Sequence, residues 1–132
     1  MNPDRQQGRL IAIDDNLDSA ELVARIARKC GYEARAVTQI NGLSELIAEW
    51  KPTVLSLDLG MPEEDGVSAL ARLQDSGFSG SLVIVSGQDR ALRQIAQRLA
   101  DARGINVAGD MQKPVNVGEL SRLLTELQNR PG

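Results

Sequence analysis

The feature that most constrains the fold of this chain is a regular alternation of short strand-like runs with longer stretches of helical periodicity. In the helical stretches, apolar residues recur at the i, i+3, i+4 and i+7 spacing of one helix face, as in Val23, Ile26, Ala27 and Cys30. The strand-like runs are segments 10–13, 33–37, 54–57, 82–85 and 106–111. Strands that alternate with amphipathic helices are typical of a parallel sheet covered on both faces, so the pattern predicts an α/β fold of five successive βα units.

Capping residues set the expected limits of the first two helices. Asp18, followed three residues later by Glu21, has the spacing of a capping box and predicts the start of the first helix. Gly31 predicts the end of that helix, because glycine favours the position just after a helix. Pro52 predicts the end of the second helix.

The fourth helical stretch combines an apolar stripe with several arginines. The stripe consists of Leu92, Ile95, Ala96 and Leu99, which we expect to face the core. The arginines lie at positions 90, 93, 98 and 103. A solvated helix face is the default expectation for such charges, and a surface for a partner protein is the alternative.

The composition excludes several classes of function. No histidine is present, which removes Ser-His-Asp and Cys-His catalysis, histidine metal sites and a phosphohistidine carrier. A net charge of −3, with one Trp, one Tyr and one Phe, argues against a surface that binds duplex DNA or stacks bases. The single cysteine, Cys30, permits no internal disulfide and is expected to be buried core filler.

Length and hydropathy predict one cytoplasmic domain. The 132 residues suit a single compact domain, 1–132. The chain has no apolar run of about 18 residues that could span a membrane. Its first segment, Met1–Arg9, is polar and lacks the apolar core of a signal peptide.

Polar side chains follow four of the five expected strands. Asp14 and Asp15 follow the first strand, Asp58 follows the third, Ser86 follows the fourth and Lys113 follows the fifth. Ligands of open parallel sheets bind beyond the carboxyl ends of the strands, where the winding direction changes. We therefore expect these five side chains to converge on one spot.

Three carboxylates at one spot require a compensating positive charge. Each pair of carboxylates repels by about 4 kcal/mol at 4 Å with an effective dielectric constant near 20. A hard cation such as Mg²⁺ fits, because it binds one or two carboxylates, waters and phosphate oxygens. The pattern therefore predicts Asp58 as a phosphoryl-accepting nucleophile, with Asp14 and Asp15 as metal ligands and with Lys113 and Ser86 as phosphate contacts.

In this order, the motifs resemble the receiver domain of bacterial two-component response regulators. The resemblance covers about residues 8–129, and its motifs are Asp14-Asp15, Asp58 with Met61-Pro62 and Asp65-Gly66, Ser86-Gly87, and Lys113-Pro114. It implies a flavodoxin-like (βα)5 three-layer sandwich, in which a parallel five-stranded sheet has the order 2-1-3-4-5.

The resemblance also implies a role for each residue of the site. Asp58 accepts a phosphoryl group from a sensor histidine kinase or a phosphotransfer protein. Asp15 and Asp58 hold Mg²⁺ (or Mn²⁺) by their side chains, Gly60 holds it by its backbone carbonyl, and Asp14 acts largely through metal-bound water. The phosphoryl contacts are Ser86 and Lys113, and the Lys113–Pro114 peptide bond is cis.

The chain departs from the family pattern three residues before the lysine. Receivers usually carry an aromatic or bulky apolar side chain there, which turns inward when the serine or threonine moves toward the phosphate. Here that residue is Asp110. Either Met111 replaces it or phosphorylation is reported differently. Gln88, like Gly60, is a candidate for setting the lifetime of the phosphate.

The segment between Ser86 and Lys113 provides a second, weaker resemblance. It is about one helical turn longer than expected, and it is similar to receivers that precede cyclic-di-GMP phosphodiesterase domains of the EAL type. No such domain follows Gly132, so we expect either a stand-alone regulator or an excised regulatory module.

Three functions remain open from the sequence. The first is a phosphoacceptor switch, which is no enzyme but assists its own phosphorylation and dephosphorylation. It would act on an output domain or partner protein, or through a phosphorylation-linked homodimer, without direct contact with nucleic acid or membrane. The second is an interaction-only pseudo-receiver adaptor, which Asp110 slightly favours. The third is a flavodoxin-like redox carrier, which the Asp14-Asp15-Asn16 sequence and the scarcity of aromatic residues disfavour.

Overall fold

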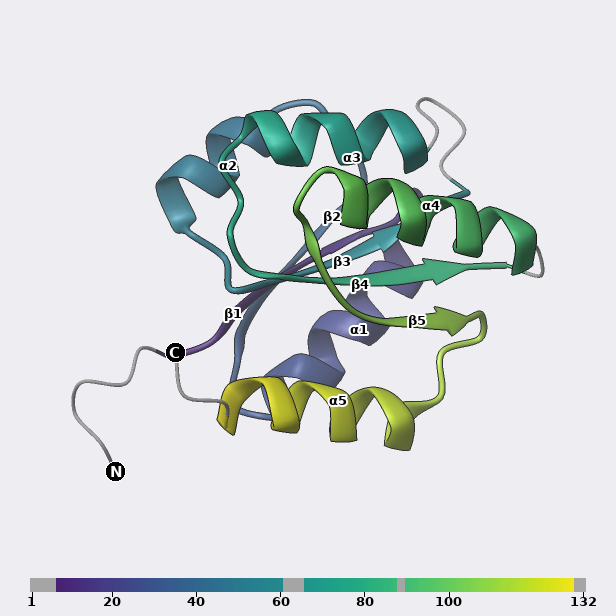
Figure 1. Cartoon of the computed structure of the whole chain (residues 1–132). Helices are drawn as coiled ribbons and strands as arrows, with labels where there is room; N and C mark the ends of the chain where they lie inside the picture. Colours follow the sequence, from purple (N-terminus) through teal and green to yellow (C-terminus); the bar gives the residue numbers. More distant parts are fainter. Residues whose placement is uncertain (1–6, 61–65, 88–89, 130–132) are drawn as a thin grey trace.

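The structure, a computed structural model, describes residues 7–60, 66–87 and 90–129. Within these residues, five strands alternate with five helices along the chain (Figure 1). The strands are β1 (Arg9–Ile13), β2 (Glu33–Val37), β3 (Val54–Asp58), β4 (Ser81–Ser86) and β5 (Asn106–Gln112). The helices are α1 (Leu17–Lys29), α2 (Leu43–Trp50), α3 (Gly66–Asp75), α4 (Arg90–Ala102) and α5 (Val117–Asn129).

The five strands form one parallel sheet of order β2-β1-β3-β4-β5. This confirms the predicted flavodoxin-like α/β fold and its strand order. The register aligns the carboxyl ends of the three inner strands, because Ile13 lies opposite Leu57 and Asp58 lies opposite Val85. Residues that follow these strands therefore emerge at one edge of the sheet.

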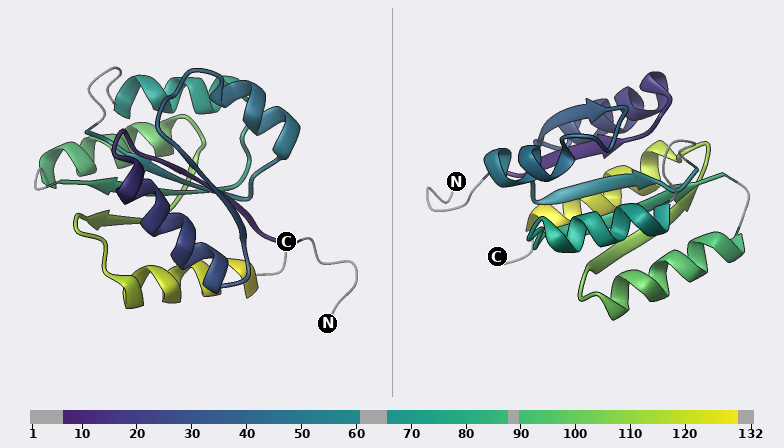
Figure 2. Two further views of the ribbon diagram at one scale, coloured as in Figure 1. Left: turned by 180° about the vertical axis from the view of Figure 1, so that it is seen from behind. Right: turned by 90° about the horizontal axis from the view of Figure 1, so that it is seen from above.

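Helices cover both faces of the sheet and bury two apolar clusters. Figures 1 and 2 show α2, α3 and α4 over one face, with α1 and α5 side by side over the other. Successive strand residues point to opposite faces, so Leu55 belongs to the first cluster and Val54 to the second. Each fully buried Leu or Ile contributes about 1.5–3 kcal/mol, which explains why the inner strands are almost continuously apolar.

The predicted start of α1 is wrong by two residues. The capping residue is Asn16, whose side-chain oxygen accepts the backbone N–H of Ser19 at 3.0 Å. Asn16 is also held by its own N–H, which donates to Asp14 Oδ1 at 3.0 Å. Asp18 therefore lies in the first turn of the helix, where its negative charge interacts favourably with the positive end of the helix dipole. The predicted end is confirmed, because Gly31 adopts a positive φ of 94°.

Helix α4 differs from its expected packing at two positions. Ala96 is buried, but Ile95 of the same apolar stripe is 51% exposed. Conversely, the Arg93 side chain is only 12% exposed, whereas Arg90 and Arg98 are exposed as predicted.

Cys30 is half-buried rather than buried as expected, and its thiol lies 3.7 Å from the carbonyl of Ser121.

Every helix in the described part of the chain is too short or too polar to cross a lipid bilayer.

Candidate functional site

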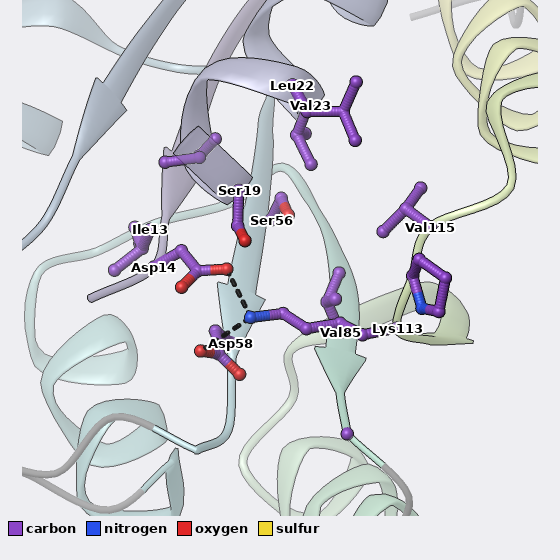
Figure 3. A pocket seen from close by; sticks show the side chains of 14 residues that line it. Ile13, Asp14, Ser19, Leu22, Val23, Ser56, Asp58, Val85, Lys113 and Val115 are labelled. Atoms are coloured by element: carbon purple, nitrogen blue, oxygen red, sulfur yellow. Dashed lines mark hydrogen bonds and ion pairs between the residues drawn. The ribbon is translucent and has the colours of Figure 1, made fainter. Parts of the chain in front are cut away.

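Three charged side chains meet at the carboxyl edge of the sheet. Asp14 follows β1, Asp58 is the last residue of β3, and Lys113 follows β5. The Lys113 ammonium lies 2.6 Å from Asp14 Oδ2 and 3.1 Å from Asp58 Oδ2 (Figure 3). Lys113 thus points into the site, and it contacts both carboxylates at once.

Backbone hydrogen bonds fix where these side chains leave the sheet. The N–H of Asp14 donates to the carbonyl of Val37 at 3.1 Å, which extends the β1–β2 ladder by one residue. The N–H of Lys113 donates to the carbonyl of Ser86 at 2.7 Å and joins the two residues expected to contact phosphate. The Lys113–Pro114 peptide bond is cis, as the resemblance implies.

Asp14, Asp15 and Asp58 form an acidic cluster. Each offers a carboxylate oxygen, and the three oxygens lie within 4.8 Å of one another. Asp14 and Asp58 are buried, at 5% and 4% exposure, whereas Asp15 is exposed. The two buried carboxylates share one ammonium, which leaves the cluster with more negative than positive charge.

Burial and pairing shift the pKa values of two of these groups. Burial raises the pKa of the Asp14 carboxyl above its ordinary value, although the hydrogen bond from Lys113 acts in the opposite direction. Burial alone would lower the pKa of the Lys113 ammonium, but its hydrogen bonds to Asp14 and Asp58 outweigh that effect and raise it. Lys113 therefore stays charged at neutral pH.

The donor set fits a hard divalent cation. Oxygens that share a Mg²⁺ ion at about 2.0–2.1 Å lie roughly 3–4 Å apart, so small adjustments would close the 4.8 Å cluster around one ion. Carboxylate oxygens are the ligand type that Mg²⁺ and Mn²⁺ prefer. Gly60, the expected backbone ligand, lies next to this cluster, and its N–H donates to Asp58 Oδ1 at 3.0 Å.

The hydroxyl of Ser86, at the end of β4, has no hydrogen-bond partner among the described residues. Its residue exposure is 2%, and Oγ makes no hydrogen bond within that part of the chain. Burying a hydroxyl without a partner costs about 1–3 kcal/mol. Such a group is stabilised by any acceptor that enters the site, and a phosphoryl oxygen is a strong one.

The two candidates for signal relay point to opposite faces of β5. Asp110 is exposed and pairs with Arg93 of α4, with Nε and Oδ2 4.0 Å apart. Met111 is buried in the cluster that α1 and α5 cover, together with Val85 and Leu120. Of these two residues, Asp110 is therefore the one on the α4 side.

Some predicted features lie outside the described residues. They are Gln88 and the motif residues Met61, Pro62 and Asp65.

A cavity of about 390 Å³ opens beside the acidic cluster. Apolar side chains line much of it, among them Leu22, Val23 and Val115 (Figure 3). Ser19 and Ser56 line it as well, and of these five residues the sequence singled out only Val23, as part of a helix face and not of a site. The available signal was the position of Leu22, which lies on the first helix outside the stripe that faces the core.

Comparison with known proteins identifies the family. The response regulator receiver domain matches residues 10–125 of this chain. The chain therefore belongs to the response regulator receiver domain family, as the order of its motifs predicted.

Individual relatives align with more than nine-tenths of this chain at low sequence identity. A crystal structure of a response regulator from Colwellia psychrerythraea superposes with a TM-score of 0.82 and 28% identity, over 96% of this chain and all (100%) of that one. The transcriptional regulatory protein BasR of Escherichia coli is 28% identical over 92% of this chain. A protein-glutamate methylesterase/protein-glutamine glutaminase of a Nocardioides species is 24% identical over 91% of this chain. The chain spans only 52% and 32% of these two relatives, respectively.

Proposed function

We propose that this chain is a phosphoacceptor switch that receives a phosphoryl group on Asp58. The observation that carries the proposal is the contact of one ammonium, Lys113, with two buried carboxylates, Asp14 and Asp58, beside a buried hydroxyl without a described partner. If these side chains served only to stabilise the fold, each buried polar group would be expected to have a hydrogen-bond partner, because unpaired buried polar groups destabilise the native state. A site for a transferred anionic group accounts for both features.

The chemistry follows from the positions of the side chains. A carboxylate oxygen of Asp58 attacks phosphorus, an O–P bond forms, and the bond from phosphorus to the donor's leaving atom breaks. The leaving electron pair stays with the donor, which is an imidazole nitrogen of a phosphohistidine or an acyl oxygen of a small phosphodonor. Lys113 and Ser86 then donate hydrogen bonds to the phosphoryl oxygens, where the negative charge is greatest.

A divalent cation held by Asp14, Asp15, Asp58 and the Gly60 carbonyl would neutralise carboxylate and phosphoryl charge. The acidic excess of the cluster favours such an ion. Once it is present, Lys113 is free to exchange its contact with Asp14 for one with the phosphoryl group.

The surroundings of the cavity suit a protein as phosphodonor. Leu17, Leu22 and Val117 are 55%, 40% and 54% exposed; Leu17 and Val117 are the first residues of α1 and α5, and Leu22 lines the cavity. Exposed apolar side chains grouped beside a reactive carboxylate are suited to docking a helix of the donor protein. A sensor histidine kinase or a phosphotransfer protein would bring its phosphohistidine to Asp58 in this way.

The experiment is an intact-mass measurement after treatment with acetyl phosphate and Mg²⁺. We expect the wild-type chain to gain the mass of one phosphoryl group, and Asp58→Asn to gain none. Asp75→Asn, which alters an exposed carboxylate on α3, is the matched control and should label like the wild type. Equal labelling of wild type and Asp58→Asn would contradict the assignment of the phosphoacceptor.

The same measurement separates the switch from an interaction-only adaptor. The adaptor would bind Mg²⁺ without gaining mass, because its acidic cluster would remain while the transfer step was lost. Chelation of the metal should abolish labelling of the switch, since the charge of the three carboxylates would then oppose an incoming phosphate.

A further inference from the structure

Arg93 is a largely covered cation that links α4 to two other parts of the chain. Its side chain is 12% exposed, which is unusual for an arginine on the outer layer of a fold. Its Nη1 donates to the carbonyl of Gly87 at 3.3 Å, and its Nε lies 4.0 Å from Asp110 Oδ2. One guanidinium therefore joins α4 to the segment after β4 and to β5.

Both partners of Arg93 are adjacent to residues of the phosphate site. Gly87 directly follows Ser86, whose buried hydroxyl has no partner among residues 7–60, 66–87 and 90–129. Asp110 lies on β5, three residues before Lys113, and pairs in register with Ile84 of β4. A movement at either phosphate contact would thus act on the contacts of Arg93.

We propose that Arg93 is the positioning residue through which α4 responds to phosphorylation of Asp58; this inference rests on the function proposed above. When the Ser86 hydroxyl donates a hydrogen bond to a phosphoryl oxygen, the carbonyl of the next residue, Gly87, shifts, and the hydrogen bond that it accepts from Arg93 lengthens. The guanidinium then moves closer to Asp110, and α4 moves with it. In this chain, an ion pair replaces an aromatic side chain as the reporter of the phosphorylated state.

Three observations make the exchange of partners physically reasonable. The Arg93–Asp110 pair is loose in the unmodified chain, at 4.0 Å, so it can tighten. A Cβ placed on Gly87 would meet no described atom within 4 Å, so no described side chain packs against that side of the residue. A planar guanidinium can also hold a carbonyl and a carboxylate together, whereas the single ammonium of lysine cannot do so with the same geometry.

The test measures the initial rate of labelling by acetyl phosphate with Mg²⁺ in single and double variants. Arg93→Ala removes both the Gly87 contact of the unmodified arrangement and the Asp110 contact that tightens on phosphorylation, so its labelling rate should no longer depend on the residue at position 110. Asp110→Asn removes the carboxylate that attracts the guanidinium after phosphorylation, so it should label about five-fold more slowly than the wild type. In the double variant, Asp110→Asn should have no further effect, because its partner is absent.

A second measurement follows α4 itself by the backbone amide resonances of ¹⁵N-labelled protein. Phosphorylation should shift the resonances of residues 91–96 in the wild type. The shifts should be smaller in Arg93→Lys and nearly absent in Arg93→Ala. The matched control is Arg98→Ala, which removes an exposed arginine from the same helix and should behave like the wild type. If Arg93→Ala does not fold, the exposed Asp110→Asn variant provides the same test, because loss of the carboxylate should likewise reduce the shifts of residues 91–96.

The outcomes separate this inference from the function on which it rests. A wild-type chain that gains no phosphate would overturn both. A wild-type chain that is labelled, while the resonances of residues 91–96 shift alike in Arg93→Ala and Arg98→Ala, would overturn only the role of Arg93. Additive effects of Arg93→Ala and Asp110→Asn would likewise show that the two residues act independently.

Discussion

The two ends of the sheet carry polar side chains of opposite character. At the amino end, the hydroxyl of Thr53 accepts the N–H of Arg9 at 3.0 Å and donates to its carbonyl at 3.2 Å. The amide of Asn106 likewise donates to Ser81 Oγ at 3.1 Å. At the carboxyl end, Asp14 and Asp58 are buried with one shared ammonium.

The difference shows that size alone does not locate function in this molecule. A cleft of about 750 Å³ lies at the amino end, lined by Thr53, Ser81 and Asn106, and it is larger than the 390 Å³ cavity at the carboxyl end. The polar groups of the amino end satisfy one another and hold strands together. Those of the carboxyl end have excess charge and a hydroxyl without a described partner, which a ligand would satisfy.

The largest effect that separates the two ends is expected from their lysines. Lys113→Ala should slow labelling by acetyl phosphate by about 100-fold, because a cation that stabilises the transferring phosphoryl group is lost. Lys51→Ala removes a lysine that lines the amino-end cleft and should leave the rate unchanged. Initial rates from intact mass would measure both, and similar rates for the two variants would remove the distinction between the ends.

The second effect concerns the pKa of Tyr32, which precedes β2 at the amino end and is the only tyrosine of the chain. Burial raises the pKa of its phenol to about 12, and the nearby Cys30 thiol adds to the shift. Its hydroxyl donates to the carbonyl of Leu124 at 2.7 Å, which requires the protonated form.

Because the folded-state pKa lies above the unfolded value near 10, this stabilisation is full below about pH 10 and is lost as the pH rises through about 12. The loss amounts to about 3 kcal/mol, since each pKa unit corresponds to about 1.4 kcal/mol. Titration of the single tyrosine by ultraviolet absorbance should give a midpoint near 12 in the folded chain and near 10 in urea. A midpoint near 10 in both would show that Tyr32 is accessible to water.

The smallest effect is expected at Thr53. Thr53→Val removes both hydrogen bonds to Arg9 and leaves its N–H without that acceptor, which should lower the free energy of unfolding by about 1 kcal/mol. Urea denaturation would measure the loss, and Thr53→Ser should restore most of it because the hydroxyl is kept. Labelling by acetyl phosphate should not change in either variant, since a change would couple the amino end to the phosphate site.

The fold was predictable because burial on both faces leaves a strong signal in the sequence. Inner strands such as β3 are apolar at nearly every position, and their helices show a clear apolar stripe. The candidate site was predictable for a related reason: Asp14 and Lys113 directly follow strands and Asp58 ends one, and parallel strands bring such residues together.

Features that depend on contacts between distant segments were not predictable. Arg93 lies at a position expected to be solvated, and only the packing of α4 beside β5 and the segment after β4 brings Asp110 and Gly87 next to it. One local feature was missed as well, because Asn16 caps α1 instead of Asp18 where the Asp14 side chain holds the Asn16 backbone in place. The hydrogen bonds of Thr53 were missed in the same way, since the hydroxyl bonds a strand 44 residues away along the chain.

The most direct measurement locates the phosphoryl group on the chain. Borohydride reduces an acyl phosphate of aspartate to homoserine, which peptide mass spectrometry assigns to a single position. After treatment with acetyl phosphate, we predict homoserine at position 58 when Mg²⁺ is present and none when the metal is chelated. Homoserine at another aspartate, or equal conversion with and without metal, would contradict the account.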